Sequence, residues 1–234
     1  HNITRRKLLQ GMAMTGAGIA GTGLAAAGLA TAMPAIASTN GTKGSNTMNT
    51  PLKGNVNHSV SRWTYGDLSI EELCQTVKQL GFGAIDLVGP EDWPVLKQYG
   101  IDSSMCNGAE ISLEDGFIHS ELHDELEARY IKHIDLVADA GYTNLICFSG
   151  NARGMSREDG LENAVKGLKR ILPHAEKRNV VIFMELFNSK VDHPDYMADN
   201  SAWAIELCKR LGSKHFSLLS VSYTHLRAHE TETN

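Results

Sequence analysis

The chain lacks the features that mark several common classes of protein. No Gly-x-Gly-x-x-Gly pattern follows its first strand-like segment, which removes the main sequence support for a dinucleotide-binding fold. Its 4 cysteines include no Cys-x-x-Cys pair, and three of them lie in apolar segments, so buried free thiols are expected rather than disulfides or a zinc cluster. The 22 Lys and Arg against 27 Asp and Glu form no basic stripe. This argues against a nucleic-acid-binding surface.

Residues 1–37 predict an export signal. A pair of arginines, Arg5 and Arg6, precedes a Gly/Ala-rich apolar run over residues 11–32, which leads to a small-x-small cleavage site before Ser38. The pair resembles the twin-arginine class of signal. This predicts the twin-arginine export machinery as a partner, and a periplasmic or exported protein without stable membrane insertion after cleavage. A transmembrane anchor is the alternative, since the run is about long enough, but its Ala, Gly and Thr content makes a weak membrane helix.

Three further regions follow the signal. Residues 38–54 are rich in Ser, Thr, Asn, Gly and Lys without periodicity, which predicts a disordered linker. Residues 55–219 carry the regular pattern of a folded domain. Residues 221–231 equal the translation of a common transposase sequencing adapter, so residues 220–234 are expected to be adapter-derived. We therefore expect the gene to be cut inside a sixth strand, and the polypeptide as written to be an inactive fragment.

Strand-like and helix-like segments alternate through the domain. The expected strands are 58–65, 83–88, 101–106, 143–148, 180–186 and 216–219, and the expected helices begin near 69 and span 93–99, 120–140, 157–177 and 201–211. Such alternation implies parallel strands joined by helical crossovers. An open doubly wound sheet and an eight-stranded barrel both fit this pattern, because a cut chain does not exclude the longer barrel.

One apolar run, residues 180–187, carries a single carboxylate, Glu185. A buried carboxylate must be hydrogen-bonded, protonated or given a metal ion. Catalytic or metal-binding work and a hydrogen-bonded core position are therefore equally open for it. In a parallel barrel the carboxyl ends of the strands build the active site, and here those ends lie near Trp63, Asp86, Asn107, Ser149 and Glu185. Asp86 is interpreted as a cap or loop hydrogen-bonding residue.

Several other residues are weaker candidates. Trp63 is a candidate wall of a sugar pocket, with core packing as an equal alternative. Ser149 and Asn151 lie in a glycine-containing loop after a strand, which favours a substrate-binding loop over an ordinary turn. His119 and His123 are four residues apart, but without a correctly placed glutamate they do not form a zinc protease motif. We expect both histidines to be solvated helix residues.

Three stretches resemble the hydroxypyruvate isomerase branch of the xylose-isomerase-like barrels. They are FMELFNSK (183–190), CFSGNARGM (147–155) and GLENAVKGL (160–168). The resemblance runs from about residue 58 to 219. It implies an α/β fold, the parallel (β/α)8 TIM barrel, truncated here to about six strands and five helices.

The resemblance also implies a metal site and an activity. In that family strands five to eight each supply one ligand to a divalent metal ion, most often Mg²⁺ or Mn²⁺, and Glu185 matches the ligand of strand five. The implied reaction is isomerisation or epimerisation of a small hydroxycarbonyl compound, of hydroxypyruvate or sugar type, by enediolate proton transfer, with Glu185 as catalytic residue. Asn107, at a strand end, is a predicted substrate contact, and Asn188 follows Glu185 at a position that contacts substrate or supports the metal shell. Lys190 follows at another such position, although it fits plain surface charge equally well.

Other functions share this scaffold. A lyase or dehydratase would use the same metal site, and a non-catalytic periplasmic sugar-binding barrel would have lost it. An abasic-site endonuclease would need additional metal-binding histidines, and no histidine is found at the ends of expected strands three to five.

Overall fold

The structure is a computed structural model that describes residues 56–220. The predicted export signal, the linker and the predicted adapter-derived tail from residue 221 onward lie outside the described residues.

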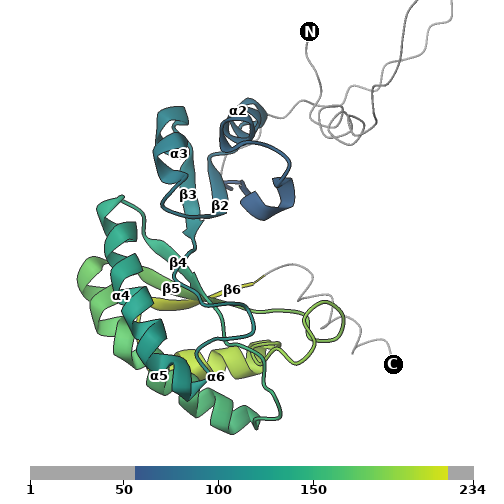
Figure 1. Cartoon of the computed structure of the whole chain (residues 1–234), viewed down its shortest axis with the longest axis vertical. Coiled ribbons are helices and arrows are strands. Elements are labelled where there is room, and N and C mark those ends of the chain that lie inside the picture. Colours follow the sequence, from purple (N-terminus) through teal and green to yellow (C-terminus); the bar gives the residue numbers. More distant parts are fainter. Residues whose placement is uncertain (1–55, 221–234) are drawn as a thin grey trace, which may run out of the picture. The chain divides into compact units, whose positions relative to one another are not determined.

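Six parallel strands form one sheet in the order β1-β2-β3-β4-β5-β6 (Figure 1). They are β1 (Ser59–Ser61), β2 (Ala84–Val88), β3 (Asp102–Cys106), β4 (Asn144–Cys147), β5 (Val181–Glu185) and β6 (Phe216–Leu219). A doubly wound sheet reverses its strand order at a switch point, whereas here each strand pairs with the next one along the chain. The predicted α/β class is confirmed, and the topology is that of a partial TIM barrel.

Helices connect successive strands and cover one face of the sheet. The α-helices are α2 (Ile70–Leu80), α3 (Trp93–Tyr99), α4 (His123–Asp139), α5 (Arg157–Arg178) and α6 (Ser201–Leu211), with 3₁₀ turns η1 (Arg62–Tyr65) and η2 (Ser120–Leu122). Figure 1 shows α4 and α5 side by side outside β4 and β5. Within residues 56–220, no helix has both the length and the apolarity that a membrane span requires.

The ends of the helices follow from local sequence. The predicted capping box of α2 is present, with the Glu72 N–H donating to Ser69 Oγ at 3.2 Å and the Ser69 N–H donating to Glu72 Oε2 at 2.9 Å. Helix α3 ends at Gly100, as predicted, because its φ of 65° lies in the left-handed region that glycine tolerates best.

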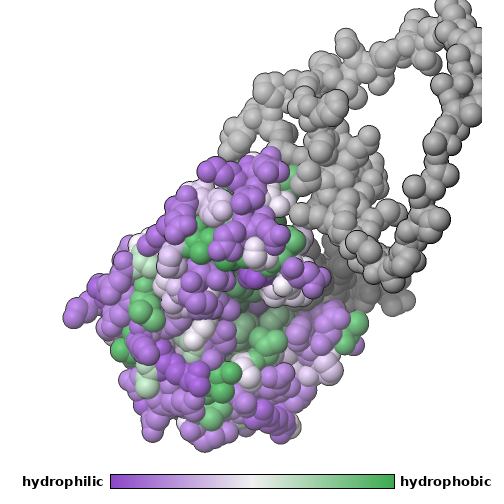
Figure 2. Space-filling model, turned by 45° about the horizontal axis from the view of Figure 1, so that its top comes forward, coloured by the Kyte–Doolittle hydropathy of each residue, from purple (hydrophilic) through white to green (hydrophobic). Residues whose placement is uncertain are grey.

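The core lies between the sheet and its helices. On β5, Ile182 and Met184 are fully buried toward this layer. Because side chains alternate along a strand, Phe183 and Glu185 lie on the opposite face of β5. The space-filling view shows a mostly hydrophilic surface with hydrophobic residues (green) gathered in a hollow (Figure 2). All four cysteines are free and three are buried, which confirms the expectation for them.

Two local predictions were wrong. The first strand is shorter than expected, because the guanidinium of Arg62 donates to the carbonyls of Tyr65 (2.9 Å) and Leu68 (3.1 Å) and holds the segment after Ser61 in a 3₁₀ turn. His119 and His123 are not solvated but are 3% and 5% exposed. Their ring nitrogens lie near loop carbonyls, so these side chains fix the loop before α4 rather than face water.

Candidate active site

A cleft of about 800 Å³ opens at the carboxyl ends of the strands. Each of the first five strands contributes to it, through Trp63 after β1, Leu87 in β2, Asn107 after β3, Phe148 after β4 and Glu185 at the end of β5. The remaining lining residues come from the loops that follow these strands: Arg62, Glu110, Ile111, Ser112, Leu113, Phe187, Asp192 and His193. This is the edge at which parallel β/α folds form their ligand sites.

Glu185 is the most unusual group in the cleft. It ends β5, is 8% exposed, and burial raises its pKa from the usual 4.5 to about 7. Among residues 56–220 its carboxylate has no hydrogen-bond or ion-pair partner, while its backbone carbonyl accepts a hydrogen bond from the Tyr196 hydroxyl. A buried carboxylate in this state is satisfied by a proton or by a cation.

The charge of the cleft is negative. Glu110 and Asp192 join Glu185 there, and Arg62 is the basic residue among the lining side chains of the described structure. The guanidinium of Arg62 is already bound to two backbone carbonyls. Three carboxylates against one arginine favour a cation or an uncharged polyol over a chain of phosphates.

Stacked aromatic rings line the cleft that contains Glu185. Phe148 and Phe187 are stacked with ring centroids 5.9 Å apart, and the His193 ring stacks on Phe187 at 4.1 Å. Tyr196 packs edge-on against the same phenylalanine at 4.8 Å. Phe187 lies two residues beyond Glu185, so the period of the strand could have predicted its place in the cleft.

The cleft brings together three residues that the sequence analysis predicted one by one as candidate site residues. Trp63, Asn107 and Glu185 all line it, although they are separated by many residues in the chain. Asp86, which the sequence interpreted as a hydrogen-bonding residue, accepts hydrogen bonds from the hydroxyls of Ser59 and Ser104 across the neighbouring strands. It therefore ties β1, β2 and β3 together.

Ser149 and Asn151 lie outside this lining. Ser149 is fully buried, its N–H donates to the Tyr196 hydroxyl at 2.9 Å and its Oγ accepts from the Ala198 N–H at 3.0 Å. Asn151 pairs with Tyr196 in an antiparallel bridge and donates its N–H to the Glu114 carbonyl. The contacts of both residues hold the loop after β4 in place.

Asn188 and Lys190 also lie outside the lining and shape the loop after β5. The Lys190 N–H donates to Asn188 Oδ1 at 3.0 Å, and the His193 N–H donates to the Asn188 carbonyl at 3.0 Å. This turn carries Asp192 and His193 to the cleft. Direct contact of Asn188 and Lys190 with a substrate stays a prediction.

Tyr196 connects the ends of β4 and β5, and its replacement by phenylalanine should destabilise the fold. Its hydroxyl accepts from the Ser149 N–H at 2.9 Å and donates to the Glu185 carbonyl at 3.1 Å. Without it both backbone groups lose a partner in the interior, at a cost of about 1–3 kcal/mol. The free energy of unfolding in urea measures the change.

Tyr142 supplies the matched control for this variant. Among residues 56–220 its hydroxyl is buried without a hydrogen-bond partner, and burial raises its pKa to about 12. Tyr142→Phe should therefore leave the free energy of unfolding unchanged or raise it. Equal destabilisation by Tyr142→Phe and Tyr196→Phe would contradict a linking role for the Tyr196 hydroxyl.

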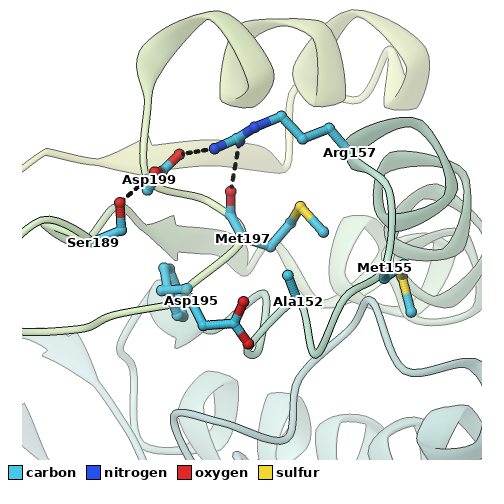
Figure 3. A pocket seen from close by; sticks show the side chains of 8 residues that line it. Ala152, Met155, Arg157, Ser189, Asp195, Met197 and Asp199 are labelled. Atoms are coloured by element: carbon cyan, nitrogen blue, oxygen red, sulfur yellow. Dashed lines mark hydrogen bonds and ion pairs between the residues drawn. The ribbon is translucent and has the colours of Figure 1, made fainter.

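A second cavity, of about 290 Å³, lies between the start of α5 and the segment before α6 (Figure 3). Its arginine, Arg157, donates to Asp199 Oδ1 at 2.7 Å and to the Met197 carbonyl at 3.2 Å. The Ser189 hydroxyl donates to the other oxygen of Asp199. Because these polar groups bind one another, we interpret their hydrogen bonds as structural contacts that hold the loop before α6 in place.

Glu185 is the candidate ligand for a divalent metal ion that the sequence analysis named, and it lies in the cleft. Within residues 56–220, no group of three or more His, Cys, Asp or Glu side chains is placed to hold a metal. The unpartnered carboxylate of Glu185 has the chemistry that Mg²⁺ or Mn²⁺ prefers. It does not complete a cation site by itself.

The sequence matches the family described as "Xylose isomerase-like TIM barrel" over residues 74–223. The chain belongs to this family. The match agrees with the strand order and with the position of the cleft. No curated protein matches the sequence.

Solved structures share the fold at low sequence identity. An AP endonuclease of family 2 from Brucella melitensis is 17% identical with a TM-score of 0.61, and covers 69% of this chain and 67% of its own. D-Psicose 3-epimerase from Clostridium cellulolyticum H10, solved with D-tagatose, is 12% identical with a TM-score of 0.58. The match covers 73% of this chain and 65% of the epimerase. The IolI protein, solved with a zinc atom, is 13% identical with a TM-score of 0.56. The match covers 68% of this chain and 60% of the IolI chain. The chain thus spans about two thirds of the length of these structures.

Proposed function

We propose that this chain belongs to an isomerase or epimerase that moves a proton between neighbouring carbons of a small hydroxycarbonyl compound of hydroxypyruvate or sugar type. The observation that carries the proposal is Glu185, a buried carboxylate without a partner in the described structure, at the end of a barrel strand and in a cleft of about 800 Å³. Sugar epimerases among the solved structures of the same fold support it.

Glu185 is suited to acid–base chemistry at neutral pH. Without a bound metal ion, a pKa of about 7 lets one carboxyl group both accept and release a proton near that pH. The stacked rings of Phe148, Phe187 and His193 line the same cleft as Glu185. Mg²⁺ or Mn²⁺, if bound at Glu185, would stabilise the negative charge that develops on the substrate oxygens.

An endonuclease activity is disfavoured by the charge of the cleft. A nucleic-acid backbone carries one negative charge per phosphate, and its binding sites collect lysines and arginines. Here Glu110, Glu185 and Asp192 outnumber Arg62, whose guanidinium is held by carbonyls. An uncharged sugar encounters no such repulsion.

Deuterium exchange tests the proposal. The protein is incubated in deuterium oxide with Mg²⁺ or Mn²⁺ and either hydroxypyruvate or a ketohexose. Proton NMR then follows the signal of the C–H group beside the carbonyl. We expect exchange with at least one substrate, and a rate lower by about 10²–10⁴-fold in Glu185→Gln.

Two outcomes would contradict the proposal. Exchange that persists unchanged in a folded Glu185→Gln variant would remove the catalytic role of this residue. Sugar binding without exchange in the unaltered protein would favour the non-catalytic sugar-binding barrel instead. Circular dichroism of both proteins shows that the variant keeps its fold.

A further inference from the structure

Apolar side chains make up much of the cleft, which is more than a small hydroxy acid requires. Six of the lining residues are apolar: Trp63, Leu87, Ile111, Leu113, Phe148 and Phe187. The cleft volume of about 800 Å³ lies near the upper end of the ~300–1,000 Å³ range of sites that enclose drug-sized ligands. A three-carbon acid or a single open-chain sugar would contact only part of these apolar side chains.

Trp63 stands out because it is exposed in the cleft. It is 72% exposed, whereas the other two tryptophans, Trp93 and Trp203, are 4% and 6% exposed. The 3₁₀ turn η1 fixes its backbone directly after β1. A large apolar ring in such a place gains free energy when a ligand covers it.

Leu87 provides an independent observation. Regular alternation along β2 would place it on the same face as Ile85, which is fully buried toward the helices. Instead, the register with β3 shifts on either side of Asp86, Leu87 takes a φ of 58°, and its side chain lines the cleft. Val88 then occupies the buried position.

The left-handed conformation of Leu87 is unfavourable for a bulky side chain. Bulges near active sites commonly redirect one side chain, and backbone strain of this kind persists where a function uses it. Asparagine would adopt the same conformation with less strain. The chain therefore retains an apolar side chain in the cleft at a conformational cost.

We propose that the substrate carries an apolar group, aromatic or aliphatic, next to its hydroxycarbonyl part, and that Trp63, Leu87, Ile111 and Leu113 bind this group. The substrate class is that of sugars or hydroxycarbonyl compounds with an aryl or alkyl substituent, such as glycosides, rather than free hydroxypyruvate. This inference rests on the proposed function for the reacting end of the substrate.

Intrinsic fluorescence tests the inference, because Trp63 is the exposed tryptophan of the described structure. The probes are phenyl β-D-glucoside and methyl β-D-glucoside, which differ in their apolar group, titrated without metal. We expect the phenyl probe to shift the emission to shorter wavelength and to bind at least about tenfold more tightly than the methyl probe.

Leu87→Asn separates binding from folding. The variant should lose most of the preference for the phenyl probe, while its urea midpoint stays the same or rises because Asn suits the left-handed backbone. Equal affinities of the two probes for the unaltered protein would overturn the inference. So would a Leu87→Asn variant that keeps the full preference.

The two proposals fail separately. Deuterium exchange on small substrates together with equal probe affinities would leave the isomerase proposal intact and refute the apolar subsite. A preference for the phenyl probe without any exchange would support the subsite and refute the reaction.

Discussion

Glu185→Gln should unfold at a higher urea concentration than the unaltered protein at pH 8. Burial raises the pKa of Glu185 from 4.5 to about 7, and one pKa unit corresponds to about 1.4 kcal/mol. The ionised carboxylate therefore destabilises the folded state by roughly 3 kcal/mol above pH 7. Glutamine is nearly the same size and carries no charge, so the variant lacks this penalty.

The sign of the pH dependence follows from the raised pKa. Below pH 4.5 the carboxyl group is protonated in both the folded and the unfolded chain, and the two proteins should be equally stable. Between pH 4.5 and 7 the unfolded chain releases this proton first, so the folded state loses stability as the pH rises. The difference in unfolding free energy between the variant and the unaltered protein should grow over this range and stay constant above it.

Urea unfolding at pH 4, 6 and 8 measures this difference. Glu162→Gln is the matched control, because Glu162 lies on the exposed face of α5 in an ion pair with Lys166 at 3.6 Å. It should change the free energy of unfolding by less than about 1 kcal/mol at each pH. A Glu185→Gln variant that is no more stable than the unaltered protein at pH 8 would show that the carboxylate is satisfied in solution.

Greater stability of Glu185→Gln at pH 8 would connect stability with function. A group that costs stability and contacts no partner in the described structure is typical of a site that binds something else. The same substitution is expected to stabilise the chain and to slow proton exchange by about 10²–10⁴-fold. If Glu185 had only a structural role, Glu185→Gln would lower both the stability and the exchange rate, or change neither of them.

Much of the fold could be predicted from the alternation of strand and helix patterns. Helices α3 and α6 begin and end at the predicted residues, and the capping box of α2 is where Ser69 and Glu72 place it. The strand order could not be predicted from alternation alone, because a doubly wound sheet shows the same pattern. Pairing of each strand with the next decides it.

The candidate site was predicted in part, for a physical reason. Trp63, Asn107 and Glu185 end or follow strands, and parallel strands bring their carboxyl ends to one edge. Glu110, Asp192 and His193 lie deeper in the loops, whose course depends on distant contacts. No periodic signal marks such residues.

Leu87 and Ser149 show how tertiary contacts override local pattern. Alternation assigns Leu87 to the helix-facing core, and the bulge in β2 turns it into the cleft. Ser149 follows a strand as a binding residue would. It is nevertheless fully buried, and its N–H donates to the hydroxyl of Tyr196, which lies far along the chain.

Gly116→Ala should have the largest effect on stability of any small substitution near the cleft. A Cβ at this position would lie 2.3 Å from the Phe148 carbonyl oxygen and 2.6 Å from the Gly150 nitrogen. Real Cβ atoms do not approach backbone atoms so closely, and backbone cannot rotate away as a side chain can. We expect a loss on the order of 4 kcal/mol in the free energy of unfolding.

Gly83→Ala is the control, since a Cβ there meets no atom within 4 Å and its backbone is outside the left-handed region. It should leave stability unchanged or raise it by less than about 1 kcal/mol. Urea unfolding of both variants makes the comparison. Similar stabilities would mean that the loop does not rest on the end of β4 in solution.

The Gly116→Ala substitution should also affect ligand binding in the cleft. The Phe117 and Ile118 N–H groups donate to the carbonyls of Phe148 (3.1 Å) and Ser149 (3.0 Å), so the loop is held along the end of β4. Leu113, three residues before Gly116, lines the cleft. A methyl group that lifts this loop should weaken binding of the phenyl probe, even in the fraction of Gly116→Ala that stays folded. Full probe affinity in that folded fraction would show that Leu113 is positioned independently of the contact at Gly116.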